Sequence, residues 1–148
     1  MLLRTPIVVL SCVLGLAACG EVEDTRPGQP VAQRRAAFKN ILRAFEPMGI
    51  QLREGQYEPD KFLAKAKELS TLKETPWPYF AGDTNYPPSR AKARVWSEPD
   101  RFDSERRGFL TAADGLLAAA ERRDEQRVRT AYATLHEQCR SCHKAFKD

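Results

Sequence analysis

Residues 124–146 are DEQRVRTAYATLHEQCRSCHKAF, and this stretch decides the fold of the chain. Asp124 and Glu125 are typical of the first turn of a helix. Apolar side chains then follow at helical spacing on one face, namely Val128, Tyr132, Leu135 and Phe146. Two cysteines and a histidine fall on the same face. The stretch therefore predicts an amphipathic helix whose buried side carries reactive groups.

Three further segments show helical periodicity, and no stretch alternates apolar and polar side chains over the length of a strand. The helices are expected at residues 31–52, 59–72 and 97–122, with Ser97 as the N-cap of the third. Pro47 predicts a kink or an end in the first helix. Between the second and third helices the chain contains Pro76, Pro78, Pro87 and Pro88, which exclude a continuous helix. We predict an all-α protein, an antiparallel four-helix bundle with a long crossover loop between helices 2 and 3.

The last helix contains Cys139-Arg140-Ser141-Cys142-His143, a C-x-x-C-H arrangement typical of covalent haem attachment. At about 100° per residue, Cys142 lies about 60° to one side of Cys139, and His143 lies about 40° to the other. Both thiols can therefore add to vinyl groups at one edge of a porphyrin while the imidazole reaches the iron. We predict one covalent haem c on Cys139 and Cys142, with His143 as the proximal iron ligand.

Three other interpretations of this motif compete. A redox disulfide of the thioredoxin type belongs in a βαβ setting, which this chain lacks. Zinc would need His136 as a fourth ligand, and four ligands along one straight helix cannot surround a tetrahedral ion. Chance is disfavoured because no other cysteine lies between Cys19 and Cys139.

The N-terminal residues predict export. Residues 1–18 are the expected signal peptide, in which Arg4 precedes an apolar run too short to span a bilayer comfortably. The run ends in Leu16-Ala17-Ala18-Cys19-Gly20, which resembles the lipobox of bacterial lipoproteins, so Cys19 is the expected lipidation site. Ordinary cleavage that leaves Cys19 free is the alternative. Residues 19–30 are predicted to be a flexible tether and residues 31–148 the folded domain. We expect a periplasmic protein of a Gram-negative bacterium that meets the membrane only through this lipid anchor.

The composition limits the function further. The 148 residues are 42% hydrophobic and 30% charged, which fits one globular domain. The net charge is only +4, with both signs spread along the chain. Such a mild charge argues against nucleic-acid binding.

Residues 31–148 resemble the class II cytochromes c, the cytochrome c′ family. Besides the haem motif, the resemblance rests on Arg34-Arg35-Ala36-Ala37-Phe38, Pro76-Trp77-Pro78-Tyr79-Phe80 and Val95-Trp96-Ser97 with Phe102. It implies that Arg34 approaches a haem propionate, that Phe38 covers the open face of the iron, and that Lys147 is the basic residue one turn beyond the proximal histidine. The residues alone allow Arg34 to be a solvated charge, Phe38 to be plain core packing, and Lys147 to complement the helix dipole.

The expected function depends on the sixth iron position, for which Met48 and His136 are the remaining candidates. Neither is well placed by helical geometry, because His136 lies on the same helix as His143 and Met48 lies about 15 Å along the first helix from Phe38. We therefore expect a five-coordinate haem that binds small gases, nitric oxide or carbon monoxide. The alternative is a six-coordinate, low-spin electron carrier.

Electron transfer to redox partner proteins can coexist with gas binding. The basic residues expected to serve it are Arg127, Arg140, Lys144 and Lys147, unless they form an ordinary solvated face. We expect no enzymatic activity, because a peroxidase needs a polar distal group that Phe38 does not provide. Trp77 and Trp96 are expected to fasten the crossover loop rather than relay electrons. The family resemblance also implies a possible homodimer through the first two helices.

Overall fold

The computed structural model describes residues 22–148, so the predicted signal peptide and Cys19 lie outside the described residues. It contains four long helices, one short helix and one 3-10 turn: α1 (Pro30–Arg53), α2 (Pro59–Leu72), η1 (Trp77–Tyr79), α3 (Arg94–Ser97), α4 (Pro99–Glu121) and α5 (Glu125–Phe146). No strand occurs in residues 22–148, where the sole extended pairing is an isolated bridge between Ala91 and Lys147. No helix in this range is both long and apolar enough to cross a bilayer. The all-α prediction is confirmed.

The ends of the helices follow local chemistry. Proline occupies the first turn of α1, α2 and α4, where a missing N–H costs nothing. Asp124, which the sequence places at the start of the last helix, caps α5 and accepts a hydrogen bond from the backbone N–H of Arg127. The helix α1 does not end at Pro47 but continues to Arg53. One prediction was wrong, because Ser97 ends α3 whereas Glu98 holds the N-cap position of α4.

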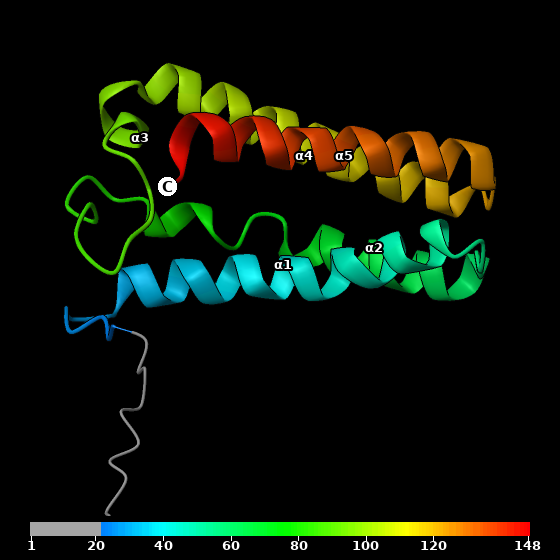
Figure 1. Ribbon diagram of the computed structural model, residues 1–148, viewed down its shortest axis with the longest axis horizontal. Helices are drawn as coiled ribbons and strands as arrows, with labels where there is room; N and C mark the ends of the chain where they lie inside the picture. The colour runs from blue at the N-terminus through cyan, green and yellow to red at the C-terminus, as the bar shows by residue number, and fades with distance from the viewer. Residues whose placement is uncertain (1–21) are drawn as a thin grey trace, which may run out of the picture.

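The four long helices form an antiparallel bundle (Figure 1). The helices α1 and α2 pack as one pair and α4 and α5 as the other, and α2 packs against α4 between the pairs. The start of α1, the crossover loop and the end of α5 all lie at one end of the bundle (Figure 1). We call this the loop end.

Apolar side chains form two clusters. The larger runs along the bundle and includes Phe45, Phe62 and Leu116. The smaller consists of Val95, Ala145 and Phe146 at the loop end, with Phe80 and Phe102 packed against it. Burial of these side chains, each worth about 1.5–3 kcal/mol, is what holds the bundle together.

The crossover loop is fastened by its two tryptophans. The indole N–H of Trp77 donates to the Lys73 carbonyl (2.8 Å), and that of Trp96 donates to the Ala81 carbonyl (2.8 Å). The Trp77 ring also packs edge-on against Phe38 and Phe109. These contacts agree with the structural role expected for both side chains.

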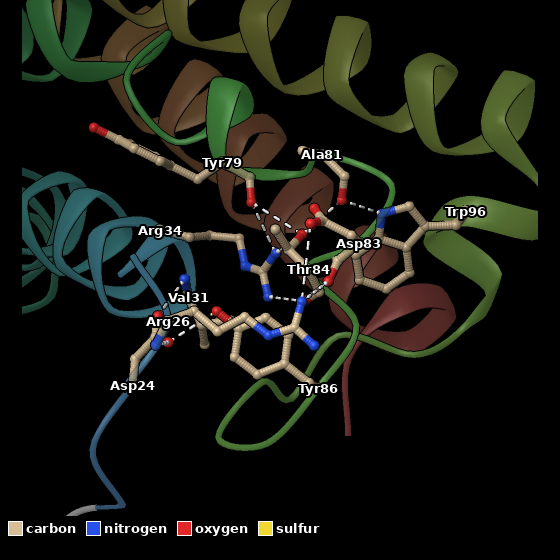
Figure 2. A network of polar contacts seen from close by, with 10 residues as sticks. All are labelled: Asp24, Arg26, Val31, Arg34, Tyr79, Ala81, Asp83, Thr84, Tyr86 and Trp96. Carbon is tan, nitrogen blue, oxygen red and sulfur yellow. Dashed lines mark hydrogen bonds and ion pairs between the residues drawn. The ribbon is translucent and has the colours of Figure 1, made fainter. Parts of the chain in front are cut away.

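The segment before α1 is packed against the domain. The buried carboxylate of Asp24 accepts hydrogen bonds from the Val31 N–H (2.8 Å), the Ala32 N–H (3.1 Å) and the Tyr86 hydroxyl (2.8 Å). Arg26 lies over the Tyr86 ring, 3.9 Å from its centre. The sequence predicts a free tether up to residue 30, but the structure fastens the chain from Asp24 onward (Figure 2). The cause is the unpaired N–H groups at the start of α1, which a carboxylate can satisfy.

Candidate functional site

The predicted attachment residues lie on the last two turns of α5. Cys139 packs against the larger apolar cluster and Cys142 against the smaller one, so the two thiols lie where the clusters meet. Both cysteines are free thiols, and within residues 22–148 no three His, Cys, Asp or Glu side chains gather as ligands for a metal ion.

The protonation of these groups follows from their surroundings. Burial raises the pKa of both Cys139 and Cys142 to about 11, and the nearby charge of Glu105 adds to the effect on Cys142. Both are therefore neutral thiols at pH 7. Partial desolvation and the positive charge of Lys147 lower the pKa of His143, although part of this residue remains exposed to solvent. A neutral imidazole is the form that binds a metal.

The contacts between α1 and α5 fix which residues face each other. Arg129 donates to the Leu52 carbonyl (2.7 Å). One turn further along, the Tyr132 ring lies against Gly49, and one turn beyond that the His136 ring stacks near Phe45 with ring centres 6.2 Å apart. Each step back along α1 thus matches an equal step forward along α5.

Extending this register by eleven residues along both helices brings Phe38 and His143 to the same level. Phe38 is eleven residues before Gly49, and His143 is eleven residues after Tyr132. At 1.5 Å per residue, both lie about 16 Å from the Gly49–Tyr132 contact, toward the loop end. Phe38 is partly buried, with its ring edge-on to Trp77 (5.6 Å) and Phe80 (6.3 Å). Its packing is thus established, and its level on α1 is the one expected for a side chain opposite the proximal histidine.

Neither candidate for a sixth ligand is at this level. Met48 is fully buried in the larger apolar cluster, ten residues along α1 from Phe38 and hence about 15 Å from the level of His143. His136 is exposed on α5, about 10 Å along the same helix from His143. The structure agrees with the sequence-based argument that both are poorly placed.

Arg34 is buried at the loop end, only 4% exposed, so the solvated-charge interpretation is wrong. Its guanidinium donates to the Tyr79 carbonyl (3.0 Å), the Thr84 hydroxyl (3.2 Å) and carbonyl (3.5 Å), and the Ser89 hydroxyl (2.7 Å). It also lies over the Phe80 ring, 4.5 Å from its centre. Figure 2 shows Arg34 reaching from α1 into the crossover loop. Desolvation lowers the pKa of Arg34, whereas Tyr86 and Asp24 raise it.

All the acceptors of Arg34 in residues 22–148 are neutral, and no carboxylate there lies within 4.0 Å of its guanidinium. A buried cation whose partners are all neutral can bind an additional anionic group that compensates its charge. The sequence did not single out Thr84 or Ser89 for this cluster, because their distance from Arg34 along the chain hides the contact.

The basic residues at the end of α5 are not the set that the sequence predicted. Arg127 lies near the start of α5, paired with Asp124 at 3.1 Å, so its grouping with Lys144 and Lys147 was wrong. Arg140 lies 3.6 Å from Glu137. The crossover loop supplies replacements, because the Lys92 N–H donates to the Phe146 carbonyl (2.9 Å) and the Asp148 N–H donates to the Arg90 carbonyl (2.9 Å). We call Arg90, Lys92, Lys144 and Lys147 the basic edge.

These residues fit a covalent haem. Two neutral thiols and a neutral imidazole project from one helix, apolar clusters flank both thiols, and Phe38 lies level with the imidazole on the facing helix. A buried arginine without a carboxylate partner in the described part of the chain lies at the same end. This donor set is the one that attachment through thioethers and axial ligation by histidine require.

The comparisons with known proteins agree with this geometry. The family model described as Cytochrome C' matches residues 29–147. The chain is 24% identical to cytochrome c' of Rhodospirillum rubrum over 142 residues, which cover 95% of this chain and 97% of that protein. A mutant of cytochrome c prime from Alcaligenes xylosoxidans, solved as a nitric oxide complex, is 26% identical, with a TM-score of 0.78 over 85% of this chain and 99% of that one. Another variant of it, with carbon monoxide bound, has 26% identity and a TM-score of 0.77 over the same shares. The chain therefore belongs to the cytochrome c′ family, and its cofactor is covalently bound haem c with iron.

Proposed function

We propose that this protein binds small neutral gases, nitric oxide or carbon monoxide, at a five-coordinate haem. Cys139 and Cys142 hold the haem through thioether bonds, and His143 supplies the single protein ligand to the iron. The observation that carries the proposal is the register of α1 against α5, which puts an apolar side chain, Phe38, at the level of His143. Met48 is the only methionine between residues 22 and 148, and its place in the apolar core supports an open sixth position.

Phe38 also accounts for selectivity. An aromatic ring offers no hydrogen bond to an anionic or strongly polar ligand, and it leaves space only for small molecules. Its edge-on contacts with Trp77 and Phe80 restrict its movement. Solved relatives that contain nitric oxide or carbon monoxide support the same ligand class. The absence of a polar distal side chain at this position leads us to propose a binding protein rather than an enzyme.

Arg34 is proposed to meet a haem propionate. The guanidinium already uses neutral acceptors from the crossover loop, and its burial leaves the positive charge poorly solvated. A propionate carboxylate at the loop end would balance that charge.

The cellular context follows from the N-terminal sequence. The lipobox-like Leu16-Ala17-Ala18-Cys19-Gly20 supports export to the periplasm and a lipid anchor on Cys19. Replacing Cys19 with serine and comparing membrane and soluble fractions tests the anchor. An unchanged distribution between the fractions would remove it from the proposal.

A homodimer through the first two helices has one supporting feature. Leu42 and Ile50, two turns apart on α1, are 45% and 44% exposed. Large exposed apolar side chains on one helix suit a protein interface. Sedimentation of the haem-loaded protein at several concentrations tests it, and a monomer at every concentration would reject it.

Electron transfer is the second candidate, favoured by the basic edge. Within residues 22–148, no carboxylate oxygen lies within 4.0 Å of a side-chain nitrogen of Arg90, Lys144 or Lys147. The Lys92 ammonium lies 3.8 Å from the Asp148 carboxylate. Lys144 and Lys147 follow His143 within about one turn, and backbone hydrogen bonds hold Arg90 and Lys92 beside the end of α5. Positive charges at this end of the bundle can attract acidic redox partner proteins. This role is compatible with gas binding.

Absorption and electron paramagnetic resonance spectra of the haem-loaded protein, ferric and ferrous, test the main proposal. We expect five-coordinate, high-spin spectra that change when nitric oxide is added. Phe38→Ala should bind the gas faster, whereas Phe62→Leu in the core of α2 should not. A low-spin spectrum indifferent to the gas would reject the open site and leave the six-coordinate electron carrier.

The electron-transfer candidate needs its own measurement. Oxidation of the ferrous protein by hexacyanoferrate(III), an anionic oxidant, should slow several-fold in Lys92→Glu/Lys144→Glu and lose most of its salt dependence. Lys65→Glu/Lys67→Glu on α2 makes the same change in net charge away from the loop end. Equal effects of the two double variants would mean that the basic edge has no local role.

A further inference from the structure

Glu105 interrupts the apolar row of α4. Phe102, Phe109, Ala112 and Leu116 follow one another at the three- and four-residue spacing of one helix face, and they pack in the two apolar clusters. Glu105 occupies the position in this row between Phe102 and Phe109 and is half-buried. A carboxylate at an inward position needs an explanation, because burial of a charge is unfavourable unless a partner compensates it.

The partner of Glu105 comes from the haem-attachment segment. The Ser141 hydroxyl, between Cys139 and Cys142, donates to Glu105 Oε1 at 3.0 Å. Neighbouring arginines on α4 are engaged elsewhere, since Arg106 and Arg107 both pair with Asp103. In the described part of the chain, no cationic nitrogen lies within 4.0 Å of the Glu105 carboxylate. The Glu105 carboxylate therefore lies beside the attachment segment without an ion-pair partner among the described residues.

We propose that Glu105 is a positioning residue that lowers the reduction potential of the haem and holds the attachment segment of α5 against α4 through Ser141. The inference rests on the proposed attachment at Cys139 and Cys142. Ferric haem carries one more positive charge than ferrous haem, so a fixed carboxylate nearby stabilises the oxidised form. A half-buried carboxylate acts more strongly than a surface one, because less water screens it.

The test is a spectroscopic redox titration, with mediators, of the haem-loaded protein. Glu105→Gln keeps the size and the contact with Ser141 but removes the charge. By Coulomb's law, removal of a fixed negative charge near the iron would raise the ferrous-to-ferric ratio at a fixed ambient potential. We therefore expect a higher reduction potential in Glu105→Gln.

Three controls separate charge from packing. Glu121→Gln, at the far end of the same helix, makes the same change in net charge and should leave the potential unchanged. Glu105→Asp retains the charge and should stay close to the wild-type potential. Ser141→Ala removes only the hydrogen bond, so its potential should change less than that of Glu105→Gln, while its attachment segment should be cleaved faster by protease.

The outcomes distinguish this inference from the proposed function. Mass spectrometry of the peptide that contains residues 139–143 first establishes whether haem is attached there. Absence of haem from that peptide would reject the attachment on which the inference rests. Haem on that peptide with equal potentials for Glu105→Gln and wild type would reject the role of Glu105 alone. If Glu105→Gln loads haem poorly, the potential of Glu105→Ala compared with Ser141→Ala decides between charge and contact, because both lose the hydrogen bond and only Glu105→Ala loses the charge. Equal potentials of these two variants would reject the role of the charge.

Discussion

Gly49 is the position where a single methyl group should disturb the register of α1 against α5. A Cβ atom added there would lie 2.1 Å from the Tyr132 hydroxyl oxygen and 2.8 Å from the ring carbon that bears it. The Tyr132 ring cannot easily move away, because it is stacked on Phe45 with ring centres 4.3 Å apart and planes 6° from parallel. Gly49→Ala must therefore displace either the ring or the helix.

Two opposing terms set the size of the effect. Alanine is favoured over glycine in a helix interior by about 0.8–1 kcal/mol. Overpacking of a well-filled interior costs about 1–3 kcal/mol. We expect Gly49→Ala to lower the free energy of unfolding by about 0–2 kcal/mol. Gly115→Ala is the matched control, because Gly115 lies inside α4 with nothing within 4 Å of an added Cβ. It should raise the free energy of unfolding by about 0.5–1 kcal/mol.

The assay is thermal and urea unfolding of the haem-loaded protein, followed by far-ultraviolet circular dichroism and by haem absorption. The two variants should differ by about 1–3 kcal/mol, which corresponds to roughly 3–12 °C in Tm for a domain of this size. Gly49→Ala should also change the haem spectrum, because the same contact sets the level of Phe38 relative to His143. Equal stabilisation by both alanines would show that Tyr132 does not rest on Gly49 and would remove the basis of the register.

Three further predictions concern the loop end. Burial raises the pKa of the Asp24 carboxyl, but hydrogen bonds from the Tyr86 hydroxyl and from backbone N–H groups together bring it below the ordinary value. A carboxyl whose pKa is lower in the folded state stabilises that state at every pH above its unfolded-state pKa. In urea unfolding, the stability advantage of wild type over Asp24→Asn should therefore be full at pH 6 and shrink below about pH 4. An advantage that persists in acid would contradict this. Arg34→Met leaves carbonyl and hydroxyl acceptors of the crossover loop unpaired and should cost about 2–4 kcal/mol, with a smaller loss in Arg34→Lys; a neutral effect of both in the same unfolding assay would argue against the buried network. Trp77→Phe loses the 2.8 Å hydrogen bond to the Lys73 carbonyl and should cost about 1–3 kcal/mol, with faster proteolysis of the crossover loop; unchanged proteolysis would mean that the loop is held by other contacts.

Local chemistry made the helices predictable. The expected range 59–72 is the observed α2, and the last helix opens at Asp124 and Glu125 as expected. Periodicity and capping depend on residues within a few positions of each other, and a helix forms its hydrogen bonds inside the same segment. The N-cap prediction at Ser97 was wrong because a local pattern could not separate two consecutive helices. Ser97 ends α3, and Glu98 directly after it takes the N-cap position of α4.

Contacts between distant segments were not predictable. The sequence predicted that Arg34 lies on a helix but could not predict its burial, because its partners Thr84 and Ser89 follow it by 50 and 55 residues. Asp24 was assigned to a tether because its partner Tyr86 is 62 residues away. Arg127 was grouped with Lys144 by composition, although the length of α5 separates them.

The sequence by itself determined the helices, the face of α5 that carries Cys139, Cys142 and His143, and the kind of cofactor that these residues can hold. These properties follow from the 3.6-residue period and from the chemistry of side chains at fixed spacing. The tertiary structure alone decided how α1 is aligned with α5, which sets the level of Phe38 against His143, and that Glu105 contacts the attachment segment. Those facts depend on the register between helices. Residues such as Gly49 and Tyr132 set this register by packing across the bundle, and no local pattern encodes it.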